Sequence, residues 1–278
     1  MNPIVMAPTV LPDAHPLDYL NAAVAADYRS IGLRLHRSLV MPFVPVVGDP
    51  ALTAEIKRIV RDNWIDVLEI TSFYLVPEMD YATIEGALEL GAELGGRIAL
   101  VIGADRDWSR AGDSLGRMCE IAARYGMTCA IENAPNAGLA SVADIVRMIE
   151  EVGVGNAGLC LDPVNHISGG GTPEDLARLP RRYFPYTQLA DAIVGPGTLE
   201  YVDGRQKHIP RRLYGDGNMP LFAILDALPE GVPISIELQK SIATECMGEA
   251  EPTDAAWALR TREATEQFLA AYHAQRSA

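Results

Sequence analysis

Four oxygen-bearing side chains stand at the ends of short apolar runs in the second half of the chain. Three carboxylates and one amide oxygen suit a hard or borderline divalent ion, with Mg2+ or Mn2+ favoured and Co2+ or Zn2+ as alternatives. Any one of them could instead face solvent, because strand ends are polar in many folds. The chemistry therefore depends on a fold that brings the four together: Glu132, Asp162, Gln188 and Glu237.

Residues 158–191 hold two of these side chains and indicate how the chain positions them. A buried strand ends at Asp162, and a polar loop with Asn165 and His166 follows. A short helical segment then leads to a second buried strand, which carries Gln188. Successive apolar strands joined by a helix are typical of a parallel α/β sheet, which binds ligands at the carboxyl ends of its strands.

The same unit recurs along the whole chain. Apolar runs predict strands at 3–8, 31–36, 65–71, 97–102, 128–132, 157–162, 184–190 and 233–238. Helical spacing of apolar residues predicts helices at 16–28, 50–63, 80–94, 109–125, 141–152, 173–179, 219–227 and 254–273. Near-continuous apolar strands alternating with helices indicate a covered parallel sheet. Eight units in 278 residues, near the usual barrel length of about 250, favour a single (β/α)8 TIM barrel of the α/β class over an open doubly wound sheet. Without a Pro/Ser/Gly linker, one domain is expected over residues 1–278.

Composition limits the partners and the compartment. A net charge of −14 and a pI near 4.8 oppose both the phosphate backbone of nucleic acid and an anionic membrane surface. A small-molecule partner is therefore expected, and a homo-oligomer stays open. Four separated cysteines without a CxxC pair predict a reduced, cytoplasmic chain rather than a disulfide framework or a thiolate zinc site. The N-terminus lacks the pattern of a signal peptide, and no apolar run is long enough to span a bilayer.

Several segments resemble a known family. AIENAP, GLCLDPVNH with GGGTPEDLA, YTQLADA, RRLYGDG and PISIEL occur in the order found in the xylose isomerase-like barrel superfamily, the sugar phosphate isomerase/epimerase group. The resemblance covers roughly residues 65 to 270 and is weaker over the first two units. It implies one divalent metal ion held by Glu132, Asp162, Gln188 and Glu237.

The chain departs from the pattern of that family in three places. Many members have His where Gln188 stands, and many have His where Asn165 stands, with His166 next to it here. RRLYGDG keeps both glycines and an acid of the usual segment but loses its proline.

The resemblance implies proton-transfer chemistry. A metal that polarises a carbonyl and its neighbouring hydroxyl makes the adjacent C–H more acidic and stabilises an enediolate. Glu132 and Glu237 are the predicted acid and base, one taking the proton and the other returning it. The prediction is an isomerase or epimerase of a small hydroxy-carbonyl compound. A lyase that dehydrates a cyclic polyol or a dehydroshikimate-type acid is the alternative.

Further side chains are candidates for substrate binding. His36 ends the second predicted strand, Glu69 matches an acidic position of the resembling group, and Arg211 and Lys240 could anchor a carboxylate or phosphate. Each could equally be a solvated or structurally paired group. The full set is His36, Glu69, Asn165, His166, Arg211 and Lys240.

Two other classes of function were weighed. The DNA-repair branch of the superfamily needs many histidines and a basic face, and five His with a charge of −14 argue against it. A non-enzymatic binding protein that retains the carboxylates stays open.

Overall fold

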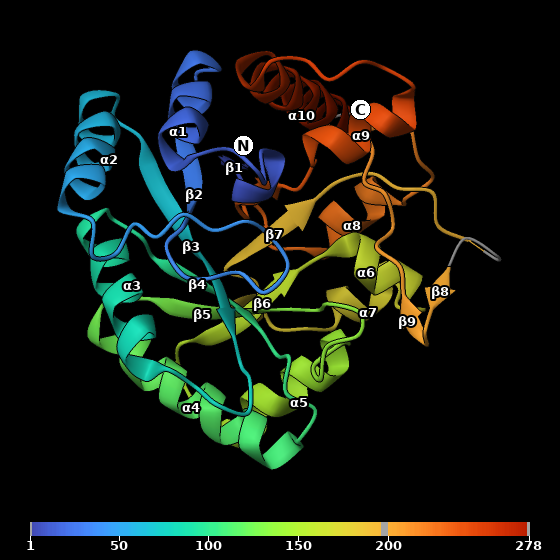
Figure 1. Cartoon of the computed structure of the whole chain (residues 1–278). Coiled ribbons are helices and arrows are strands. Elements are labelled where there is room, and N and C mark those ends of the chain that lie inside the picture. The colour runs from blue at the N-terminus through green and yellow to red at the C-terminus, as the bar shows by residue number, and fades with distance from the viewer. Residues whose placement is uncertain (1, 196–199, 277–278) are drawn as a thin grey trace.

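Eight parallel strands close into a barrel in the computed structural model, which describes residues 2–195 and 200–276 (Figure 1). Their order round the barrel is β1-β10-β7-β6-β5-β4-β3-β2, so neighbours in the chain are neighbours in the sheet. This confirms the predicted (β/α)8 TIM barrel. The barrel strands are β1 (Ile4–Met6), β2 (Ser30–Arg34), β3 (Asp66–Tyr74), β4 (Ile98–Ile102), β5 (Thr128–Glu132), β6 (Ala157–Leu161), β7 (Tyr186–Leu189) and β10 (Ile234–Ile236).

Helices surround the barrel, and the last one packs against the first beside the N-terminus (Figure 1). The predicted set is present, with two short additions, α6 and α9, directly after β6 and β10. None of the described helices is both long and apolar enough to cross a membrane. The helices are α1 (Pro16–Ala25), α2 (Pro50–Asp62), α3 (Tyr81–Glu93), α4 (Trp108–Arg124), α5 (Val142–Val152), α6 (Pro163–Ser168), α7 (Pro173–Ala177), α8 (Leu221–Ala227), α9 (Lys240–Met247) and α10 (Asp254–Arg276), with 3-10 turns at Pro8–Val10 and Arg181–Tyr183.

Local sequence signals explain where several helices begin and end. The Ser141 hydroxyl accepts the backbone N–H of Asp144 at the start of α5, as its position predicts. Thr172 and Asp175 form a reciprocal capping box at α7. Gly153 ends α5 in the left-handed conformation, with φ of 72°, where a residue with a side chain would be strained.

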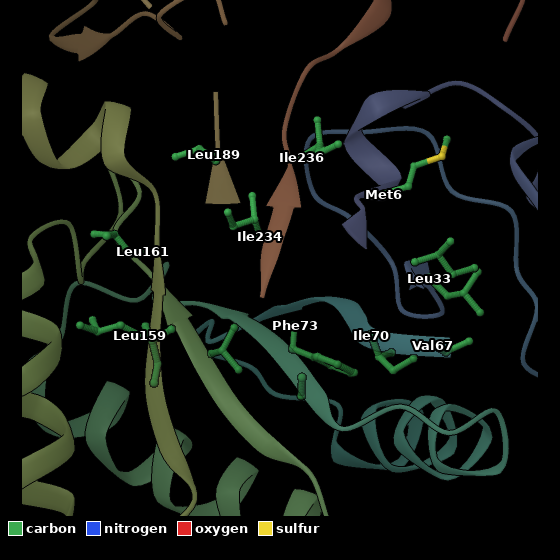
Figure 2. Close-up of a cluster of buried hydrophobic side chains, with 14 of the residues drawn as sticks. Met6, Leu33, Val67, Ile70, Phe73, Leu159, Leu161, Leu189, Ile234 and Ile236 are labelled. Atoms are coloured by element: carbon green, nitrogen blue, oxygen red, sulfur yellow. The ribbon is translucent and has the colours of Figure 1, made fainter. Parts of the chain in front are cut away.

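Side chains alternate between the barrel interior and the helix layer. Figure 2 shows outward-facing core side chains such as Met6, Leu159 and Ile236, which belong to the cluster packed under the helices. The interior holds a second, smaller cluster from the same strands: Val5, Leu68, Ile98, Leu100, Ala130, Cys160 and Tyr186. Because the strand period is two, the next inward position toward the carboxyl end can carry a functional group.

A small antiparallel hairpin lies between β7 and α8. It is formed by β8 (Tyr201–Val202) and β9 (Arg205–Gln206) and is drawn apart from the barrel in Figure 1. Asp203 and Gly204 make its turn, with φ of 50° and 73°. Positive φ at both central residues is the geometry of a type I′ turn, which Asp-Gly favours.

Candidate active site

Strand alternation aims the four predicted oxygen ligands into the barrel. Each stands two residues beyond a side chain that faces the interior, so each occupies the next inward position toward the carboxyl end. The successive inward positions are Ala130 and Glu132 on β5, Cys160 and Asp162 on β6, Tyr186 and Gln188 on β7, and Ser235 and Glu237 on β10.

The register of the sheet relates the four positions to one another. Glu132 pairs with Cys160, so it is one inward position short of Asp162 in the register of β5 and β6. Gln188 pairs with Ser235, so it is likewise one inward position short of Glu237 in the register of β7 and β10. Such offsets between neighbouring strands accompany the tilt and stagger of a closed barrel.

Asp162 is a helix cap as well as a strand-end carboxylate. Its Oδ1 accepts the backbone N–H groups of Val164 and Asn165 at 2.8 and 3.1 Å, at the start of α6. Asn133 fixes the Asp162 backbone through two hydrogen bonds of 2.9 and 2.8 Å. These contacts leave Oδ2 of Asp162 for other partners.

Arg211 supplies the positive charge of this cluster. Its Nη2 donates to Oδ2 of Asp162 at 2.5 Å, and its Nε lies 3.8 Å from Oε2 of Glu237. The side chain is only 2% exposed. The position of Arg211 follows from the next residue, because Arg212 pairs through its backbone with Asp191 just beyond β7.

The two predicted catalytic glutamates are protonated more readily than ordinary carboxyls. Burial raises the pKa of Glu132 well above its usual value, and the charges of Glu237 and Asp162 raise it further. Burial also raises the pKa of Glu237, to about 8, against the opposing charge of Arg211. Arg211 alone thus does not compensate the carboxylates gathered here.

A divalent cation fits the chemistry of this cluster. Within residues 2–195 and 200–276, no three His, Cys, Asp or Glu side chains are already arranged as ligands. Two observations are compatible with a cation: Oε1 of Gln188 is buried without a hydrogen-bond partner in the described chain, and the charge of Glu237 opposes ionisation of Glu132. Glu132, Gln188 and Glu237 are the residues that would hold it, whereas Asp162 would join them only if its Oδ2 gave up the hydrogen bond from Arg211.

A cavity of about 600 Å³ opens at this end of the barrel. Six of the predicted substrate-binding and metal-binding side chains line it: Glu69, Glu132, Asn165, Gln188, Arg211 and Glu237. Asn165 also accepts a hydrogen bond from Arg211 at 3.3 Å. Asp162 lies behind Arg211 and does not line the cavity.

Glu69 is the deepest of these acids. It is 1% exposed, and its Oε1 accepts the Ser235 hydroxyl at 2.9 Å. Burial raises its pKa, which the hydroxyls of Tyr186 and Ser235 partly offset. Gly32 makes room for it, since a Cβ there would lie 2.5 Å from the Glu69 side chain.

Three predicted binding residues lie away from this cavity. His36 stacks on Phe73 and donates from Nδ1 to the Ser72 carbonyl at 3.1 Å, in an adjacent hollow. His166 donates from Nε2 to the Thr172 carbonyl at 3.0 Å, which secures the turn before α7. Lys240 pairs with Asp254 at 2.6 Å. Each has a structural partner that the sequence could not reveal.

Other lining residues were not singled out as site residues from the sequence. They are Ser38, Tyr74, Arg106, Asn136, Arg205 and His208. Asn136 follows a proline and has φ of 68°, and Arg205 follows the Asp-Gly turn. Those turn signals predict loops but not which loops reach the cavity.

Comparisons with known proteins agree with this architecture. The family model described as xylose isomerase-like TIM barrel matches residues 20–264. Among solved structures, the IOLI protein with a binding zinc atom is 17% identical with a TM-score of 0.77, over 98% of this chain and 99% of that one.

Two further structures are similar over nearly their full length. A xylose isomerase domain protein from Alicyclobacillus acidocaldarius is 20% identical with a TM-score of 0.74, covering 98% of this chain and 99% of that one. An L-ribulose 3-epimerase is 18% identical with a TM-score of 0.69, covering 100% and 97%. A comparison with curated proteins finds no match. The family match spans most of the sequence, and the chain belongs to the xylose isomerase-like TIM barrel family.

Proposed function

We propose that the protein is a divalent-metal-dependent isomerase or epimerase of a small, sugar-like hydroxy-carbonyl compound. Glu132 and Glu237 act as the acid and base that move a proton through an enediolate. The observation that carries the proposal is a pair of carboxyls at one cavity, half-buried Glu132 and buried Glu237, of which the charge of Glu237 raises the pKa of Glu132. Two carboxyls that line one cavity can serve as a general acid and a general base.

The protein's own groups account for the proton's path. Glu132 and Glu237 project from β5 and from just beyond β10, which are separated in the barrel by β6 and β7. A substrate between them meets one carboxyl on each side, so one can take a proton and the other can return it. When bound, the metal ion would polarise the substrate carbonyl and the adjacent hydroxyl.

Arg211 orients the reacting region. Arg211 is held by Asp162 and by the Ile209 carbonyl, to which Nη1 donates at 2.7 Å. A guanidinium fixed in this way offers its charge without reorganising during the reaction. The similarity to an L-ribulose 3-epimerase supports this reaction class through the shared fold.

Solvent deuterium exchange tests the proposal. The protein with Mn2+ is incubated in D2O with a panel of ketoses and cyclic ketones, and incorporation at carbon is followed by NMR. Glu132→Gln and Glu237→Gln should each lower exchange by about 10²- to 10⁴-fold, the usual contribution of a general acid or base. Glu230→Gln is the matched control, because Glu230 is exposed before β10 at the opposite end of the barrel.

The outcomes separate the reaction classes. The isomerase or epimerase is supported if deuterium exchange is lost in both site variants and retained in Glu230→Gln. An enone chromophore that depends on the same pair would indicate the lyase instead. Wild-type exchange that survives in both Glu→Gln variants would refute the acid and base roles.

A further inference from the structure

The arginines of this acidic protein are unevenly paired. Most of the 23 lysines and arginines have a carboxylate partner, as Arg110 has Asp105 and Arg260 has Glu249. Within the described chain, Arg34, Arg106 and Arg205 have no ion-pairing carboxylate, yet all three line the cavity that holds the catalytic glutamates. We call these three the wall arginines.

Neutral groups hold Arg34 in place. Its Nη1 donates to the carbonyls of Pro12 and Pro42, both at 2.9 Å, so neutral groups fix the side chain. Asp13 is near enough to act on its charge but forms no ion pair with it. Its Nε is buried without a hydrogen-bond partner among the described residues. A fixed, unpaired guanidinium at a cavity wall attracts an anion.

Asn136 brings the other two wall arginines together. Its carbonyl accepts from Nη2 of Arg106 at 3.4 Å. Its side-chain amide bonds the backbone of Gln206 in both directions, at 2.9 Å each, which ties the hairpin to the loop after β5. Arg205 precedes Gln206 in that hairpin. One asparagine thus places two exposed, unpaired arginines on the same side of the cavity.

The cavity consequently has two kinds of lining. Glu69, Glu132 and Glu237 make its deep part acidic, where a hydroxy-carbonyl group would react. The wall arginines make part of its side basic, in a chain whose net charge of −14 otherwise repels anions. Arginine forks match the planar oxygens of carboxylate and phosphate. Such a lining fits a substrate with a charged group apart from its reacting carbon.

We propose that the substrate carries an anionic group, a carboxylate or a phosphate, which Arg106 and Arg205 bind while Arg34 adds charge from the β2 side. This rests on the proposed function for the identity of the reacting end. It replaces Lys240 and Arg211 as the expected anchors, because both of those are paired with carboxylates of the protein itself.

Binding measured apart from turnover tests the inference. Isothermal titration of the Mn2+-supplemented protein compares D-fructose, D-fructose 6-phosphate and D-glucuronate. The phosphate or the uronate should bind at least about tenfold more tightly than fructose, since a charged hydrogen bond adds about that much. Arg205→Gln should remove about tenfold of that gain, and Arg106→Gln with Arg205→Gln should remove most of it. Higher NaCl should weaken only the anionic probes.

Arg181→Gln is the matched control. Arg181 is an exposed arginine without an ion-pairing carboxylate in the described chain, and it lies before β7 at the far end of the barrel. The control should bind every probe as the wild type does. Arg106 and Arg205 are exposed, so replacing them should leave the protein folded. Circular dichroism and melting curves check this.

Each result decides the matter separately from the proposed reaction. The inference is overturned if neither anionic probe binds more tightly than fructose, or if Arg181→Gln loses as much affinity as the double variant. Tight anionic binding that the double variant loses, without any deuterium exchange at carbon, upholds the inference and counts against the isomerase. The stronger of the two anionic probes identifies the group as phosphate or carboxylate.

Discussion

Arg211 shows most clearly what the sequence could and could not predict about single residues. The inward direction of the four strand-end oxygens could be predicted because a parallel barrel places functional groups at its strand ends. Arg211 could be predicted only as a candidate anchor for a substrate carboxylate or phosphate. Its burial against Asp162 depends on the pairing of Arg212 with Asp191, twenty-one residues apart in the chain. Burying such a pair costs desolvation energy. The charges of Arg211 and Asp162 also shift the pKa of the neighbouring Glu132 and Glu237.

The raised pKa of Glu237 predicts an inverted pH dependence of stability for protein freed of metal by EDTA. The folded state keeps its proton up to about pH 8, whereas the unfolded chain loses it near 4.5. Between these values the folded state binds more protons, so the free energy of unfolding falls as pH rises and levels off above 8. One proton corresponds to at most about 1.4 kcal/mol per pH unit, or roughly 3 °C in Tm.

Melting curves of wild type and Glu237→Gln at pH 5 to 8.5 measure this effect. The difference between the two reports Glu237 together with Glu132, whose pKa the charge of Glu237 raises, because groups outside this cluster such as His36 contribute equally to both. The variant should gain stability relative to wild type as pH rises through the window. A difference that is constant from pH 5 to 8.5 would show that Glu237 does not hold its proton in the folded state.

At the scale of elements, the hairpin and the loop after β5 form one unit above the cavity. The Asp-Gly turn of the hairpin is a strong local signal. Strands of two residues are too short to show alternation, so β8 and β9 were not predictable. Their placement rests on Asn136, which contacts Gln206 across seventy positions of sequence.

Replacing Asn136 by glycine should release the hairpin without straining the loop. Glycine accepts the φ of 68° at this position, so the change removes mainly the two hydrogen bonds to Gln206. Their loss should cost about 1–3 kcal/mol of hairpin docking. Amide hydrogen exchange in residues 201–208 should become about tenfold faster or more. Exchange in the barrel strands should stay unchanged.

Asn136→Ala separates the lost hydrogen bonds from backbone strain. Alanine removes the same two bonds and also disfavours the left-handed conformation, so it should destabilise the loop further than glycine does. Unchanged exchange in residues 201–208 for both variants would mean that the hairpin is held by other contacts.

Over the whole molecule, the order of strands and helices followed from hydrophobic patterning, because each barrel strand is buried on both sides and each main helix has one apolar face. The short helices α6 and α9 were missed because six to eight residues give too little periodicity. The relative register of Glu132 and Asp162 could not be predicted either, since the offset between β5 and β6 is set only when the sheet closes. Patterning therefore specifies which residues face inward, and closure decides how they meet.

Metal binding should stabilise the entire barrel, because its predicted ligands come from four adjacent strands that must be assembled to bind. At a free Mn2+ concentration of 100 times Kd, binding to the folded state alone adds about 2.7 kcal/mol, or roughly 5–10 °C in Tm. The shift should be larger at pH 8 than at pH 6, because the ion must displace protons held by Glu132 and Glu237. Scanning calorimetry of EDTA-treated protein with and without Mn2+ measures the shift in Tm.

Glu132→Gln should lose most of the shift, whereas Glu230→Gln, on the opposite end of the barrel, should keep it. An equal shift in both variants would place the ion elsewhere on this acidic surface, and the four strand-end oxygens would then need another role.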